Sequence, residues 1–159
     1  MNIGHIQAEK AFDVIGISLR TTTKAAVAEG TIGKLWEQFF VKDILTQIPN
    51  KIDNAIIAVY YDFENDKSGA YNILIGARVS SLDTVPAWLT ALHIPAQKRS
   101  IFMSEKGPRG TIVFDLWKKI WALEDAGKLN HSYTTDYEVY DERSLDPANA
   151  QVEIHIGIQ

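Results

Sequence analysis

Polar and apolar residues alternate along residues 11–20, which predicts a strand with one buried face. From residue 24 to about residue 45 the apolar residues recur every three or four positions, as in a helix that covers a core. Two β-rich runs, residues 55–61 and 71–79, flank a polar turn and predict a hairpin. The first half of the chain therefore has the pattern β-α-β-β.

The second half of the chain repeats this pattern. Segment 30–36 reads GTIGKLW and segment 110–117 reads GTIVFDLW, so both begin with Gly-Thr-Ile and end with Leu-Trp. Gly30 and Gly33 weaken the first helix and leave its start open. The second unit is expected to consist of a strand within residues 87–103, a helix over 107–127, and strands at 135–140 and 152–158. A duplicated half-fold forms a cleft between its two copies.

Two β-α-β-β units, at about residues 11–80 and 87–159, predict a single α+β domain that spans residues 1–159. We expect a mainly antiparallel, curved sheet with two long helices on one face and a ligand groove on the other. The residues before the first strand are too few for a helix-turn-helix, so no DNA-binding domain is expected.

In the final strand, residues 152–158, apolar residues occupy every second position. These aliphatic side chains must face the helices, which sends Glu153 and His155 to the opposite face. Glu153 is a candidate ligand-binding acid, with an ordinary surface acid as the alternative. His155 is expected to hydrogen-bond at the strand surface, with a ligand contact or a proton carrier as the alternative. No histidine of the chain has metal-ligand spacing to another. We predict no metal site and no cofactor.

The strand at residues 135–140 carries an acid among aromatic residues. If Tyr137 and Val139 are its core-facing pair, Glu138 and Tyr140 point into the groove on the helix-free face. An acid in a partly dry groove carries a desolvation cost that a cationic ligand offsets. The alternative for Glu138 is a solvated strand acid without a role.

Aromatic residues near this groove complete the candidate site. Tyr60 and Tyr71 lie on the first predicted hairpin. Trp121 lies one turn after Trp117 and is expected to pack in the core, with stacking on a ligand at the edge of the groove as the alternative. Trp36 and Trp117 hold matching positions in the two helices, which favours core packing for both. Aromatic walls around a carboxylate suit flat, lipophilic cations, because the rings supply contact area and cation–π attraction.

Composition narrows the classes of function. Of the 159 residues 46% are hydrophobic, enough for a proper core. A net charge of −4 and a pI near 5.5 argue against direct binding of nucleic acid. The chain has no cysteine, which excludes disulfides, thiolate metal sites and cysteine nucleophiles. Neither a signal peptide nor a membrane-spanning run is recognisable, so we expect a soluble, cytoplasmic protein that does not contact membranes.

Three short segments resemble one known family. They are residues 104–108 (SEKGP) before the second helix, residues 136–140 (DYEVY) and residues 152–158 (VEIHIGI). Together with the duplicated β-α-β-β order, they resemble the GyrI-like family, which includes the effector-binding domains of AraC-type and multidrug-sensing transcription activators. The resemblance covers the chain from about residue 11 to residue 159.

This resemblance implies a groove between the repeats that binds small, often aromatic, cationic compounds. It places the family's groove glutamate at Glu138 and, in some members, a second acid near Glu153. Family members often carry an aromatic residue in the strand before the Lys-Gly-Pro turn, and here Phe102, later in that strand, is the candidate for this role. Gly157 stands where the family usually has a proline.

The sequence leaves three functions open. We predict that the chain binds small lipophilic, aromatic cations with Glu138 as charge partner, as a stand-alone sensor or sequestering module. Some GyrI-like proteins are hydrolases of electrophilic compounds, and by this resemblance Glu138 would act as general base, helped by Tyr140. The third alternative is an inhibitor module that binds a protein partner through the acidic loop at residues 141–146. A homo-oligomer is compatible with each of them.

Overall fold

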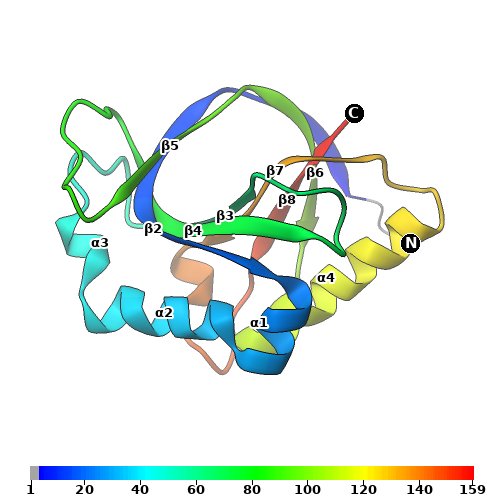
Figure 1. Ribbon diagram of the computed structural model, residues 1–159. Coiled ribbons are helices and arrows are strands. Elements are labelled where there is room, and N and C mark those ends of the chain that lie inside the picture. The colour runs from blue at the N-terminus through cyan, green and yellow to red at the C-terminus, as the bar shows by residue number, and fades with distance from the viewer. Residues whose placement is uncertain (1–3) are drawn as a thin grey trace.

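The computed structural model describes residues 4–159, and its main feature is an antiparallel sheet of eight strands with helices along one side (Figure 1). The strands are β1 (His5–Glu9), β2 (Phe12–Thr22), β3 (Ile56–Tyr61), β4 (Ala70–Val79), β5 (Thr90–Ile94), β6 (Gln97–Met103), β7 (His131–Tyr140) and β8 (Glu153–Ile158). The helices are α1 (Thr23–Glu29), α2 (Thr31–Val41), α3 (Ile44–Gln47), α4 (Arg109–Asp125) and the short 3-10 helix η1 (Glu142–Ser144). The predicted α+β architecture with a curved antiparallel sheet is confirmed.

The strand order β1-β6-β8-β7-β3-β4-β2-β5 displays the duplication. At its centre β3 pairs with β7, flanked by β4 and β2 of the first unit and by β8 and β6 of the second. In the central pair, Ala58 lies opposite Glu138. Ala58 and Glu138 are eighty positions apart, as are Gly30 and Gly110, so they occupy equivalent places in the two units. Glu138 therefore lies where the pseudo-twofold axis of the duplication passes through the sheet.

The first predicted helix consists of three short helices. Thr22 caps α1, because its side chain accepts a hydrogen bond from the Ala25 N–H at 3.0 Å. Gly30, with a φ of 67°, ends α1 and begins α2, in a conformation that glycine adopts without steric cost. Asp43, with a φ of 50°, separates α2 from α3. The expectation of two long helices is thus corrected to one, α4. Among residues 4–159 no helix is long and apolar enough to cross a membrane.

The two edge strands were not predicted as separate elements. β1 pairs with β6 through mostly exposed residues, so no apolar alternation marks it in the sequence. The strand expected within residues 87–103 is two strands, β5 and β6, with Pro95 between them. Proline has no N–H for the ladder and interrupts it there. β1 and β5 are additions to the duplicated units, one at each edge of the sheet.

Both faces of the sheet are packed. On the helix side, Ile154 and Ile156 pack with Ile120 of α4, which confirms the predicted facing of β8. On the other side the sheet curls over on itself (Figure 1). A second apolar cluster, which includes Val59 and Leu74, packs there. The expectation that the groove lies on the helix-free face is therefore wrong, because the interior of the curled sheet fills that face.

The facing of β7 also differs from the prediction. In the β7–β8 pair Tyr137 lies opposite His155, and Glu138 lies opposite Ile154. Residues directly opposite each other in an antiparallel pair share a face. Glu138 therefore lies on the helix side, and Tyr137 lies on the other side with His155. Tyr137 and Val139 are core residues as predicted, but they belong to the cluster inside the curled sheet.

Candidate ligand-binding site

Glu138 is the centre of the candidate site. It is only 2% exposed, although it is an acid. Its Oε2 atom accepts hydrogen bonds from the Tyr60 hydroxyl at 2.9 Å and from the Trp117 indole N–H at 2.6 Å, and its Oε1 atom accepts one from the Tyr140 hydroxyl at 2.7 Å. An indole N–H only donates, and the whole arrangement fits an ionised carboxylate that accepts from three neutral donors.

The electrostatic state of Glu138 follows from its burial. Burial raises the pKa of its carboxyl group, and the three hydrogen bonds lower the pKa only in part, so it stays above the usual range. Burial and the neighbouring carboxylate also raise the pKa of the Tyr60 and Tyr140 hydroxyls well above the ordinary phenol value, so both stay protonated donors. None of the ion pairs found among residues 4–159 involves Glu138.

Glu138 lines a cavity of about 1220 Å³, here called the main groove, which is bounded by α2, α4, β3, β7 and the loop around η1. The groove therefore lies between the helices of the two units, on the helix side of the sheet. Its aromatic walls are Trp36, Phe40, Tyr60, Phe114, Trp117 and Tyr140. The volume is sufficient for a drug-sized ligand, whose pockets typically measure about 300–1,000 Å³.

The aromatic walls also fix the acid. The rings of Trp36 and Tyr140 are 4.8 Å apart, and those of Tyr60 and Trp117 are 5.3 Å apart, both edge to face. Tyr60, Trp117 and Tyr140 thus each donate a hydrogen bond to Glu138, and the rings of the same side chains line the groove.

Charged side chains at the groove leave it acidic. Four acids line it, Asp53, Glu138, Asp141 and Glu142, against the two arginines Arg78 and Arg109. Both arginines have partners: Arg78 is 3.6 Å from Asp53, and Arg109 donates a hydrogen bond to the carbonyl of Ser144. Asp141 is also paired, with Arg143 at 2.7 Å, so Glu138 and Glu142 are the groove acids without an ion pair among residues 4–159. They leave the groove with a net negative charge, which favours positive ligands.

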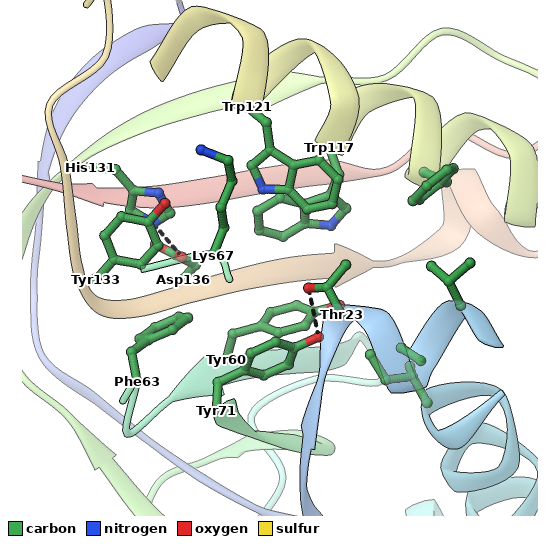
Figure 2. Close-up of a pocket in the computed structure, with 14 residues that line it drawn as sticks. Thr23, Tyr60, Phe63, Lys67, Tyr71, Trp117, Trp121, His131, Tyr133 and Asp136 are labelled. Carbon is green, nitrogen blue, oxygen red and sulfur yellow. Dashed lines mark hydrogen bonds and ion pairs between the residues drawn. The ribbon is translucent and has the colours of Figure 1, made fainter. Parts of the chain in front are cut away.

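The structure brings together three of the seven predicted site residues in the main groove: Glu138, Tyr60 and Tyr140. Two more, Tyr71 and Trp121, line a smaller cavity next to it (Figure 2). Tyr60 lines both cavities. The ligand contacts of these five residues stay predictions.

Glu153 and Phe102 lie outside both cavities, which corrects their predicted place in the groove. Glu153 points to the face opposite the helices, where it contacts Arg143 at 2.8 Å and His155 at 2.9 Å. Phe102 is 3% exposed and packs in the apolar cluster beneath α4. Glu153 is separated from the groove by the sheet itself, and Phe102 is covered by core side chains.

Trp36 and Trp117 line the groove, although their matching positions in the repeat predicted core packing for both. A signal was present in α4, where Phe114, Trp117 and Trp121 follow one another at spacings of three and four and so share one side of the helix. A buried indole N–H also requires an acceptor, and Glu138 provides it for Trp117.

A duplicated α+β scaffold with a buried acid in an aromatic groove defines the class of small-molecule effector-binding domains. The comparison with known families agrees: residues 5–158 match the family described as Cass2, integron-associated effector binding protein. The chain belongs to this family, and its general function is the binding of small-molecule effectors. The predicted resemblance to the GyrI-like group is thereby confirmed.

Individual relatives span the whole chain. A Bacillus subtilis (strain 168) protein named as a transcriptional regulator, YobU, is 29% identical over 161 residues, covering 100% of this chain and 99% of YobU. The integron cassette protein VCH_CASS2 from the mobile metagenome of Vibrio cholerae superposes with a TM-score of 0.77 at 26% identity, covering 98% of this chain and 96% of that protein. SAV2435, solved with bound tetraphenylphosphonium, shares the fold with a TM-score of 0.71 at 11% identity, over 98% and 93% of the two chains.

Proposed function

We propose that the main groove binds small aromatic cations and that Glu138 is their charge partner. The observation that carries this proposal is the buried Glu138 carboxylate, which is held by three neutral donors and lines a groove with aromatic walls. A neutral ligand would leave this charge uncompensated, and an anion would be repelled by it. A cation supplies the countercharge.

The aromatic walls favour cations that carry rings. A cation over the face of a tryptophan or tyrosine ring gains about 0.5–2 kcal/mol of binding free energy, and the gain is larger where less water reaches the site. Trp36 and Phe40 come from α2, and Phe114 and Trp117 come from α4, so rings flank the groove on both sides. A ligand between these helices contacts rings from both units.

The comparisons support this proposal. SAV2435, which shares the fold, binds tetraphenylphosphonium, a lipophilic cation with four aromatic rings. The relative YobU is named as a transcriptional regulator, which fits a ligand sensor. We infer that the present chain works as a cytoplasmic binding domain that senses or sequesters such compounds. The hydrolase and inhibitor alternatives stay predictions.

Isothermal titration with tetraphenylphosphonium and with neutral triphenylphosphine oxide tests the proposal. The wild-type protein should bind the cation in preference to the neutral compound. Glu138→Gln should weaken cation binding by about tenfold or more, because the charge is lost in a poorly solvated site. Glu153→Gln, an acid on the adjacent strand but the opposite face, is the matched control and should leave affinity unchanged. Equal affinity of the Glu138→Gln variant and the wild-type protein would show that Glu138 is not the charge partner of the cation.

A further inference from the structure

A second cavity of about 200 Å³, here called the side chamber, adjoins the main groove (Figure 2). The two cavities share Ile32, Tyr60, Phe114 and Trp117 in their linings. The other rings around the side chamber are Phe63, Tyr71, Trp121, His131 and Tyr133. A molecule that contacts Trp117 from the main groove therefore lies directly beside this chamber.

The rings of the side chamber form a connected aromatic wall. The Phe63 ring lies 5.9 Å from Tyr71 and 5.4 Å from Tyr133, and Tyr133 stacks on His131 at 3.7 Å. On the helix side Trp121 lies 5.9 Å from Trp117. Figure 2 shows these side chains arranged around one space, with the two tryptophans of α4 facing Tyr60 and Tyr71.

Both acids in and near the side chamber contact His131, whereas Glu138 contacts no basic side chain among residues 4–159. Asp136, which is 1% exposed, contacts His131 Nε2 at 2.6 Å and accepts a hydrogen bond from the Gly157 N–H at 2.9 Å. Glu124 accepts hydrogen bonds from the Tyr133 hydroxyl at 2.6 and 2.7 Å and lies 3.2 Å from His131 Nδ1.

The one lysine of the chamber is paired as well. Lys67 lines the chamber, and its ammonium group lies 2.8 Å from Asp125 at the end of α4. The chamber thus offers ring surface, and each acid in or near it already contacts a basic side chain. A second positive charge placed there would compete with His131 and Lys67 for these acids, whereas Glu138 contacts no basic side chain among residues 4–159.

From this contrast we propose that the side chamber binds the uncharged aromatic end of an elongated monocation, whose charged end lies beside Glu138 in the main groove. The inference rests on the proposed function of the main groove and specifies its ligand class. The chamber has room for such an end, because an apolar protein cavity of about 150 Å³ is known to hold one benzene molecule. Edge and face contacts with the surrounding rings would orient it.

Two cations with the same charged head test this inference by fluorescence or calorimetric titration: 1-methylquinolinium, and 1-methyl-4-styrylquinolinium, which adds a neutral aromatic arm. Ala26→Phe fills the chamber from α1, where Ala26 lines it. Ala28→Phe is the matched control, because Ala28 is exposed on the same helix and lines neither cavity.

The elongated cation should bind the wild-type protein more tightly than the compact one. Ala26→Phe should weaken binding of the elongated cation by about tenfold, the value of burying one aromatic ring, and leave the compact cation unaffected. Ala28→Phe should change neither affinity. Equal weakening of both cations by Ala26→Phe, or no weakening of the elongated one, overturns the inference. Failure of both cations to bind the wild-type protein instead refutes the proposed function, and this inference with it.

Discussion

Replacing Glu138 by glutamine is expected to stabilise the ligand-free protein while it weakens cation binding. Glutamine has nearly the same shape and can keep all three hydrogen bonds. Its carbonyl oxygen can accept from Trp117 and Tyr60, and its amide group can donate to the Tyr140 hydroxyl, which also serves as an acceptor. The substitution therefore removes the charge and little else.

The size of the effect follows from two opposing contributions to the free energy of unfolding. Hydrogen bonds to charged groups contribute about 1.5–3 kcal/mol and those between neutral groups about 0.5–1.5 kcal/mol. Neutralising the acceptor of three bonds therefore costs roughly 3–4.5 kcal/mol. Removing a buried ion recovers a desolvation penalty of several kcal/mol. The raised pKa of Glu138 indicates that desolvation outweighs the hydrogen bonds. We expect a net stabilisation of about 1–2 kcal/mol near neutral pH.

The pH dependence provides an internal check. The pKa of Glu138 is raised in the folded state. The stability that this side chain contributes is fully present below its unfolded pKa and is lost as the pH rises through its folded pKa. The advantage of Glu138→Gln should therefore be largest above the folded pKa of Glu138 and shrink as the pH falls through it towards the ordinary glutamate value. Urea unfolding followed by tryptophan fluorescence measures it, since Trp117 contacts the substituted side chain.

Glu153→Gln is the control with the opposite sign. Burial raises the pKa of the Glu153 carboxyl group, but the hydrogen bonds with His155 and Arg143 lower it by more. The pKa of Glu153 is therefore below the ordinary value. Such a group contributes stability above its unfolded pKa and loses it as the pH falls through the folded pKa. Glu153→Gln should thus destabilise the protein at neutral pH. A Glu138→Gln variant that is less stable than the wild-type protein at every pH would refute the reasoning.

Three further outcomes are expected. Affinity for tetraphenylphosphonium should fall as the pH drops through the raised pKa of Glu138, and affinity that stays constant down to the ordinary glutamate pKa range would argue against a charge partner there. Trp117→Phe removes the donor at 2.6 Å and should weaken the same binding up to about tenfold by calorimetry, whereas full retention would show that this bond does not support the ionised acid. Gly16→Ala should lower the free energy of unfolding by about 2 kcal/mol or more, because a Cβ atom there would lie 2.1 Å from the Ile75 carbonyl oxygen. An unchanged melting curve would contradict this prediction.

The sequence predicted the fold where one face of an element is polar. The alternation in residues 152–158 gave the facing of β8 correctly, because Glu153 and His155 mark its other side. In β7 the same method failed, since both faces of this strand are buried. Tyr137 is as much a core residue as Ile154, but it packs inside the curled sheet. The alternation of polar and apolar residues does not show that a second core exists. The second core is recognisable only from the curvature of the sheet in the structure.

The sequence predicted the acid of the site correctly, but it predicted only some of the aromatic residues that line the groove. Glu138 stood out as a carboxylate among aromatic residues on a β-rich run, and it does line the main groove. Trp117 was assigned to the core because it matches Trp36 in the repeat, and the matching position is real in both helices. A tryptophan can fill a core with one side of its ring and line a groove with the other. Helical spacing alone does not separate these roles.

The asymmetry between the two units has a physical reason in the register of the central strands. Ala58 and Glu138 are equivalent in the repeat and also lie directly opposite each other, fully or almost fully buried. Opposite side chains of an antiparallel pair stand about 4.5–5.5 Å apart, so an acid at both positions would bring two carboxylates together in a dry site. One of them would then take up a proton, and the groove would carry no more charge than it does with one acid. A symmetric fold with its ligand site on the axis therefore needs only one acid, and the small Ala58 beside it leaves room for the three donors that hold Glu138.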